Sequence, residues 1–308
     1  MAFRVRPQEP VGRGLIRLAG KELRSARDEL RKSTPPADDA IHEARKSIKK
    51  VRAILHLIEA DDGRSLDGCR TRLRKVNRTL SSLRDADAML EILAKLGKRD
   101  RRLFDEHSFA RVQRRLSSHK HAAAHEAEQN GTWSTVDRKL RRLRAKAKQW
   151  RPAHRGFGAL AAGIELTYRR GRKALARAQE RQGAAEFHEW RKQIKALWYQ
   201  MRLLEGRSRE LDTDAGVLHQ AETWLGDEHN VAVLCAELSK DASLCDLGSV
   251  RQAANRYQSE LRRKTIASAA PLYRRAPRDY MRRIKDAWKA RDERVGAGAA
   301  RRRRRAAA

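Results

Sequence analysis

A segment that occurs twice constrains this chain more than any other feature. Residues 41–59 read IHEARKSIKKVRAILHLIE and residues 187–205 read FHEWRKQIKALWYQMRLLE. At a constant shift of 146 positions, the two segments share His, Glu, Arg, Lys, Ile and Lys within their first nine residues. A second pair, LSSLRDADAM at 80–89 and LGDEHNVAVL at 225–234, corresponds at a shift of 145. Because two separate stretches keep a nearly constant offset, we interpret the two halves of the chain as an internal duplication.

Each repeated segment is predicted to be a helix with two distinct faces. Its apolar residues recur every three or four positions and gather on one side, whereas its cationic residues gather on another. The apolar face contains Ile41, Ala44, Ile48, Val51, Leu55 and Ile58 in the first copy, and Phe187, Trp190, Ile194, Leu197, Met201 and Leu204 in the second. The cationic stripe contains His42, Arg45, Lys46, Lys49, Arg52 and His56 in the first copy, and His188, Arg191, Lys192, Lys195, Tyr199 and Arg202 in the second.

Helical periodicity also dominates the rest of the chain, and the alternation typical of strands is nearly absent. We expect helices near 11–33, 39–60, 64–96, 101–129, 132–150, 157–182, 184–206, 213–240, 247–269 and 270–291. The connections are short, so each half is predicted to be an antiparallel bundle of about four helices. The predicted fold class is all-α.

Changes in composition predict where these units begin and end. The first helical bundle is expected over 1–151 and the second over 159–292, with PAHRGFG at 152–158 as the hinge between them. Residues 293–308 end in RRRRRAAA and contain few apolar side chains that could pack against a core. We expect this basic tail to be disordered.

The charge balance indicates an anionic partner. Lys and Arg together number 71 and Asp and Glu 39, which gives a formal net charge of +32. Such a field attracts nucleic acid, acidic membrane surfaces or phosphate polymers. No run approaches the ~18 apolar residues of a membrane span, and the start of the chain lacks the apolar core of a signal peptide. Because its three cysteines form no CxxC pair either, we expect a soluble cytoplasmic protein that does not insert into membranes.

The cationic stripe favours a bound anion, although a solvated helix face is the alternative interpretation. Like charges one helical turn apart repel by roughly 3 kcal/mol at an effective dielectric of ~20. When both groups are fully exposed, the repulsion is only a few tenths of a kcal/mol. Solvated faces usually interleave acids, but Glu43 is the only acid of the first copy before Glu59. His42 and His188 are expected in the first helical turn, where free N–H groups attract phosphate.

Together these motifs resemble a known family. His42, Arg45, Lys49, Lys50 and Arg52 form the pattern His-x-x-Arg-x-x-x-Lys-Lys-x-Arg. With RDAD at 84–87, this pattern resembles the first half of a CHAD domain (conserved histidine α-helical domain). HEWRKQIKALWY and LGDEHNVAVL resemble the second half, so the resemblance covers roughly residues 10–292. It implies two four-helix bundles related by a pseudo-two-fold duplication around a basic cavity that binds inorganic polyphosphate.

The resemblance also implies which residues bind the polymer. By motif they are His42, Arg45, Lys49, Lys50 and Arg52, and His188, Arg191, Lys192 and Lys195. The helical wheel adds Lys46, and Lys21, Arg24, Arg172 and Lys173 are candidates from neighbouring helices. Ala196 corresponds to Lys50, and Trp198 stands where a basic residue is common, so the second half is expected to bind less tightly. Asn230 replaces a usual Asp, which argues against acid chemistry at that position.

Two other function classes remain open. A sequence-independent nucleic-acid-binding protein would use the same charge and the Arg301–Arg305 tail. However, only 5% of the residues are aromatic, and those of the repeats are predicted to be buried instead of stacking on bases. A hydrolase or phosphotransferase acting through the histidines would lack a neighbouring carboxylate pair. We therefore predict a non-catalytic polyphosphate-binding protein, associated with polyphosphate granules, and leave its oligomeric state open.

No cofactor or metal is predicted. His121 and His125 are four residues apart on one predicted helix, a spacing that could hold a metal ion. A polar surface helix explains the pair equally well.

Overall fold

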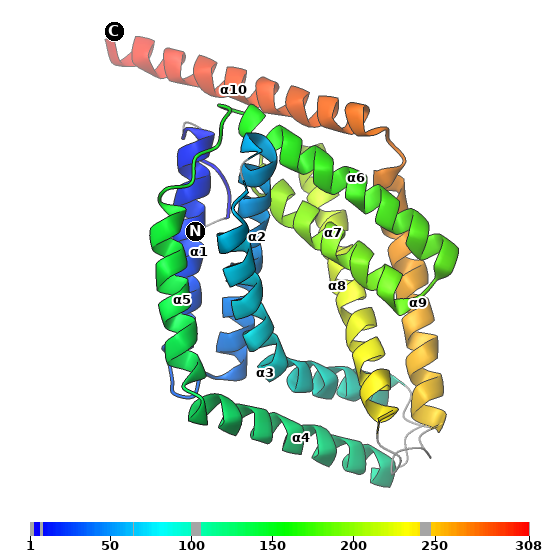
Figure 1. The fold of residues 1–308 in the computed structure, drawn as a ribbon. Coiled ribbons are helices and arrows are strands. Elements are labelled where there is room, and N and C mark those ends of the chain that lie inside the picture. Colours follow the sequence, from blue (N-terminus) through cyan, green and yellow to red (C-terminus); the bar gives the residue numbers. More distant parts are fainter. Residues whose placement is uncertain (1–2, 7–8, 64, 100–105, 241–247, 308) are drawn as a thin grey trace.

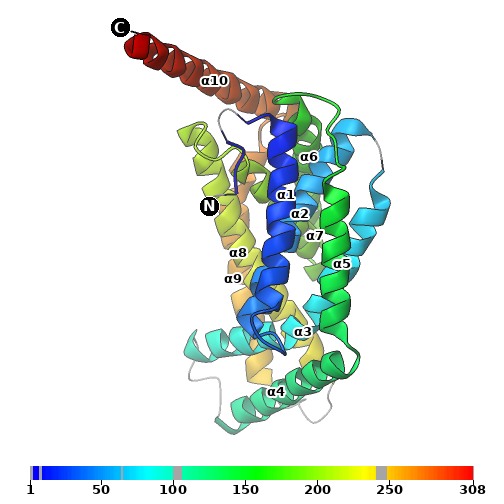
Figure 2. The same cartoon turned by 90° about the vertical axis from the view of Figure 1, so that its left-hand side faces the viewer.

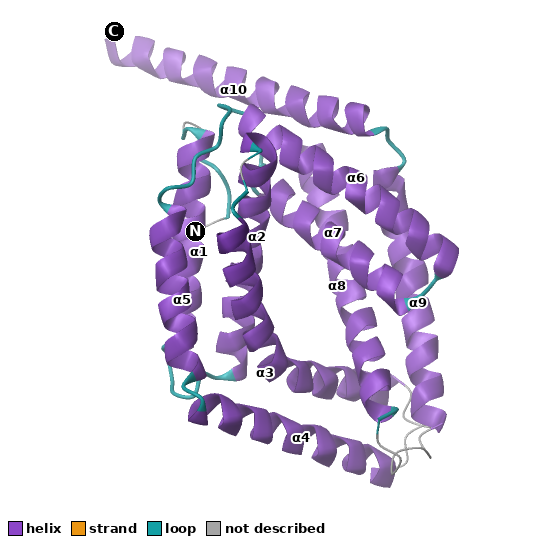
Figure 3. Cartoon of the chain, viewed as in Figure 1, coloured by secondary structure: helices purple, strands orange, loops and turns teal. Residues whose placement is uncertain are grey.

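The computed structural model describes residues 3–6, 9–63, 65–99, 106–240 and 248–307, which form helices, turns and loops (Figures 1 and 3). The predicted all-α fold is confirmed for these residues. The helices are α1 (Val11–Leu30), α2 (Asp38–Asp62), α3 (Asp67–Arg99), α4 (Glu106–Gln129), α5 (Thr132–Ala147), α6 (Gly158–Arg181), α7 (Ala184–Arg202), α8 (Arg209–Leu238), α9 (Gly248–Tyr273) and α10 (Pro277–Ala307).

Some helix ends follow signals in the sequence. Gly63 ends α2 with a left-handed φ of 67°, a conformation that glycine adopts without strain. Ser208 precedes α8, and its hydroxyl accepts a hydrogen bond from the N–H of Leu211. The expected end of the ninth helix before Pro271 is wrong, because α9 continues through that proline to Tyr273. The break falls instead before Pro277, the first residue of α10, where the missing N–H costs no helical hydrogen bond.

The end of α10 also differs from the prediction. Residues 293–307, expected to be a disordered tail, continue this helix to Ala307 and project beyond the rest of the fold (Figure 2). Ala and Arg are strong helix formers, so local propensity favours this continuation where apolar partners are few. Nearer its start α10 is anchored, since the ring of Tyr280 stacks on Tyr168 of α6 with centroids 4.0 Å apart.

The apolar faces predicted for the two repeated helices are confirmed. All twelve side chains are at most 4% exposed, from Ile41 to Ile58 on α2 and from Phe187 to Leu204 on and just after α7. Burying such faces is the main source of helix stability in a folded protein. Burial of the apolar face fixes how each helix is rotated about its own axis, and it therefore also fixes where the cationic side of that helix points.

The two predicted halves share their hydrophobic cores. The main core runs from Phe3 to Trp288 and includes residues of α1, α2, α6 and α7. At the contact between α2 and α6, a Cβ added to Gly163 would lie 2.8 Å from the Cα of Leu57, so only glycine permits this approach. A second core joins the C-terminal part of α3 to α4, α8 and α9. The expected boundary at 152–158 therefore does not separate two cores, and the division into two bundles stays a prediction.

In Figure 1 the helices are arranged like the four sides of a frame. The α2 helix and the first part of α3 lie on one side, and α7 and α8 lie on the other. The α6 and α10 helices cross one end, while the second part of α3 and α4 cross the opposite end.

A short segment before α1 ties the two sides together. Phe3 and Val5 are only 2% and 5% exposed, and the N–H of Val5 donates to the carbonyl of Leu203. The ring of Phe3 packs edge-on against Tyr199 of α7, and the Nζ of Lys50 from α2 lies 5.5 Å from its centroid. The sequence analysis assigned no structural part to this segment.

Candidate functional site

Four cations from the two repeated helices lie close to one another. We call Arg45 and Lys49 the α2 row, Arg191 and Lys195 the α7 row, and all four the cation cluster. Burial, followed by the charges of Lys195, Arg45 and Arg191, holds the pKa of Lys49 well below its ordinary value. Since charges of both rows act on the same amine, the two rows face each other.

The α2 row is poorly neutralised. Lys49 is half-buried and forms no ion pair within the described residues. The guanidinium of Arg45 donates to the carbonyl of Leu80 at 3.3 Å and lies 3.8 Å from the carboxylate of Asp85. That carboxylate is 56% exposed, whereas Arg45 is only 15% exposed. Burial lowers the pKa of Arg45, so its charge is costly here.

The α7 row has an acid of its own from α8. Glu222 forms an ion pair with Lys195, and one of its oxygens lies 3.7 Å from Nη2 of Arg191. Burial alone would raise the pKa of Glu222, but Lys195 and Arg191 hold it below the ordinary value. The same burial lowers the pKa of Lys195, although Glu222 opposes this change.

A histidine pair borders the α7 row. Nδ1 of His188 lies 3.1 Å from Nδ1 of His229 on α8, with ring centroids 4.3 Å apart. Burial and the charge of Arg191 lower the pKa of His229 to about 3. Burial and Lys192 lower the pKa of His188, and burial and Arg84 lower that of His42. These rings are therefore neutral near pH 7 and would gain protons if an anion arrived.

Other predicted site residues lie in ion pairs outside the cation cluster. Lys46 pairs with Glu43 at 2.7 Å, and Lys192 pairs with Glu189 at 2.8 Å. Both pairs are exposed. Lys50 points toward α1, where its Nζ is 2.9 Å from the buried carboxylate of Glu22.

The two copies differ most at their C-terminal ends. Burial and the charge of Arg74 lower the pKa of Arg52, and burial and Arg52 lower the pKa of His56 to about 4. In the second copy Trp198 replaces Arg52 and stacks on His219, with centroids 4.4 Å apart. An aromatic stack thus takes the place of a cation.

The remaining candidates lie on α1 and α6. Arg24 and Lys173 are exposed, whereas Lys21 and Arg172 are half-buried. Arg172 lies beside Tyr168, whose hydroxyl donates to carbonyls at the end of α9. None of these four residues is among the groups that shift the pKa of Lys49 or Lys195, so their part in the site stays a prediction.

Glu222 was not among the site residues predicted from the sequence. Extending the second correspondence by three positions pairs Glu222 with Asn77 of α3. The sequence signal that could have identified Glu222 is this difference between the copies, an acid at one position and an amide at the corresponding position. His229 was aligned with Arg84, but its contact with His188 depends on how α8 packs against α7.

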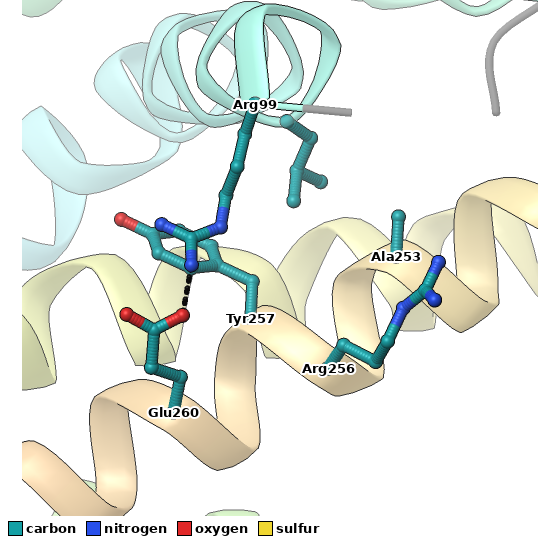
Figure 4. Close-up of a pocket in the computed structure, with 6 residues that line it drawn as sticks. Arg99, Ala253, Arg256, Tyr257 and Glu260 are labelled. Carbon is teal, nitrogen blue, oxygen red and sulfur yellow. Dashed lines mark hydrogen bonds and ion pairs between the residues drawn. The ribbon is translucent and has the colours of Figure 1, made fainter. Parts of the chain in front are cut away.

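A hollow between the C-terminal end of α3 and α9 is lined by two further arginines, Arg99 and Arg256 (Figure 4). The guanidinium of Arg99 lies 4.8 Å from the ring centroid of Tyr257 and forms an ion pair with Glu260. Its charge is already paired, so we do not assign this hollow to the cation cluster.

The exposed His125 contacts Gln129 at 3.0 Å, and the described residues contain no group of three or more side chains suited to holding a metal ion. None of the helices in the described part of the chain combines the length and apolar character of a membrane span.

The sequence profile of the CHAD domain matches residues 15–239. The chain belongs to the CHAD domain family. The match includes both cationic rows and ends shortly after α8, so it is shorter than the range expected from the motifs. No curated protein sequence matches the chain.

Solved structures support the same CHAD fold beyond the range of the profile. PptA from Streptomyces chartreusis superposes with a TM-score of 0.57 at 17% identity, covering 90% of this chain and 99% of PptA. The CHAD domain from the plant Ricinus communis gives a TM-score of 0.51 at 17% identity, covering 91% of this chain and 90% of that domain. At this identity the likeness concerns the fold alone.

Proposed function

We propose that this CHAD protein binds inorganic polyphosphate between α2 and α7. The observation that carries the proposal is the half-buried Lys49, which is surrounded by like charges and lacks an ion pair in the described residues. Polyphosphate is a flexible chain with about one negative charge per unit and no bases to recognise. Closely spaced ammonium and guanidinium groups suit such a ligand, because both donate charge-assisted hydrogen bonds to phosphate oxygens.

The proposal includes a basic cavity where duplicated halves meet. In its support, the rows correspond position by position, Arg45 to Arg191 and Lys49 to Lys195. A ligand that contacts Lys49 would therefore lie near cations of both copies.

We propose that the protein binds polyphosphate without catalysing a reaction on it. A base with a pKa of about 3, such as His229, abstracts protons poorly near pH 7. The nearest buried acid, Glu222, is held in ion pairs with the α7 row. Association with polyphosphate granules in the cytoplasm would follow from such binding.

The test is a double charge reversal, Lys49→Glu with Lys195→Glu. We expect its affinity for long-chain polyphosphate to fall by more than about 100-fold, because both rows then repel the polymer. Circular dichroism should show that the helices remain. The matched control is Lys146→Glu with Lys148→Glu, which makes the same change in net charge at exposed positions on and just after α5.

Equal losses in the two variants would contradict the proposal, because net charge alone would then explain binding. A second readout is the melting temperature, which polyphosphate should raise with a gain that shrinks as salt increases. If duplex DNA of matched charge raised it equally, nucleic acid would become the better-supported ligand.

A further inference from the structure

Glu222 lies where the proposed ligand needs free cations. Its carboxylate forms an ion pair with Lys195 and lies 3.7 Å from Arg191. It also acts across the frame on Lys49, whose depressed pKa it partly restores. With only 12% of its side chain exposed, Glu222 is a built-in anion shared by three members of the cation cluster.

A carboxylate and a phosphate compete for the same donors. Both accept charge-assisted hydrogen bonds from ammonium and guanidinium groups. A phosphate that binds Lys195 and Arg191 must therefore displace the Glu222 carboxylate or remain close to its negative charge. Either route costs part of the binding free energy.

The first copy has no equivalent anion. Asn77 occupies the corresponding position on α3, and its buried Oδ1 has no hydrogen-bond partner in the described residues. The acid nearest the α2 row is Asp85, which is 56% exposed and 3.8 Å from Arg45. Lys49 itself forms no ion pair in the described residues, so a ligand that binds it breaks none of its own.

We propose that Glu222 is an internal counter-ion that makes the site specific for polymeric anions. The proposal rests on polyphosphate binding at the cation cluster. A single phosphate or sulfate ion contacts too few groups to offset the loss of the ion pairs of Glu222. A polymer also engages the α2 row, and the second contact is then intramolecular and far more favourable. Glu222 therefore excludes small anions more strongly than it weakens the polymer.

The test is Glu222→Gln, which keeps the side-chain shape and removes the charge. We expect its apparent affinity for sulfate and orthophosphate to rise by at least about tenfold over wild type. Affinity for tripolyphosphate should rise as well, and affinity for long chains should rise least. Without ligand the variant should melt at a lower temperature, because the cation cluster has lost its counter-ion.

The chain offers a matched control on the same helix. Asp214 is another little-exposed acid of α8, and it forms an ion pair with Arg283 of α10. Asp214→Asn should lower the melting temperature without ligand but leave the response to sulfate as in wild type. If Glu222→Gln does not fold, Glu222→Asp retains the charge on a shorter side chain and should give a smaller gain in sulfate affinity.

The sign of the effect decides between two roles. If Glu222 only positions Lys195 and Arg191, its replacement weakens the binding of every anion, and the proposal is wrong. A wild-type protein that does not bind polyphosphate at all would instead overturn the proposed function. In that case the sulfate titrations of wild type and Glu222→Gln would still reveal whether Glu222 blocks an anion site.

Discussion

The α2 and α7 rows are built from the same sequence pattern, yet their charges are balanced differently. Lys195 and Arg191 share Glu222, which is 12% exposed, whereas Lys49 forms no ion pair in the described residues. The difference comes from the neighbouring helix, since α8 supplies an acid where α3 supplies Asn77. A duplicated motif therefore fixes which cations point inward, but the partner helix decides how much of their charge is available.

The largest difference should appear in ligand affinity. We predict that Lys49→Ala lowers the affinity for long-chain polyphosphate by about 100-fold and Lys195→Ala by about tenfold, because the charge of Lys195 is already partly neutralised. Isothermal titration calorimetry at fixed salt measures both values. Equal losses, or a larger loss for Lys195→Ala, would show that the two rows contribute alike.

Stability without ligand should change in opposite directions. Lys49→Met removes a half-buried charge that has no ion pair, and we expect the free energy of unfolding to rise by about 1 kcal/mol. Lys195→Met leaves Glu222 with only the longer contact to Arg191, and a decrease of about 1 kcal/mol is expected. Urea unfolding at neutral pH measures both changes, and the same sign for both would remove the contrast between the rows.

The smallest effect should be a pH dependence of the second copy. His229 has a pKa of about 3 in the folded protein, compared with about 6.5 in an unfolded chain. As the pH falls, the unfolded state therefore takes up the proton first. The contribution of His229 to the free energy of unfolding is complete above pH ~6.5 and is lost as the pH falls toward 3. Because the ring is coupled to His188 and partly exposed, we expect this loss to be roughly 1 kcal/mol at pH 5.

Replacing the histidines one at a time tests this assignment. The variant His229→Gln should lose less stability between pH 7 and pH 5 than wild type. His42→Gln should reduce this loss by a smaller amount, because the pKa of His42 is lowered less. His56 contributes a similar acid sensitivity and stays in place in both variants. An identical pH profile for His229→Gln and wild type would count against the histidine pair as its source.

Most of the fold could be predicted because apolar periodicity is strong in this chain. The helices were expected within a few residues of their ends, except where two prolines offered two possible stops. Pro271 lies near the end of α9, where it disturbs few hydrogen bonds, and only packing reveals that Pro277 begins α10. The helical form of 293–307 was missed because we considered packing partners and not local propensity.

The site could be predicted only on the repeated helices themselves. The helical wheel placed Lys46 and Lys49 in one stripe, but Lys46 pairs with Glu43 at the surface and Lys49 faces Lys195. That distinction depends on the position of the neighbouring helix, and the periodicity of one helix does not reveal where its neighbours lie. Glu222 could not be selected for the same reason, since its role arises from the packing of α8 against α7.

The length of α3 has a mechanical consequence. Its first part, with Leu73 and Leu80, belongs to the main core, and its second part, with Ile92 and Leu96, belongs to the other core. One helix therefore connects the two cores although it changes direction between them (Figure 1). Because cores are tightly packed, a displacement of either one is passed on through α3.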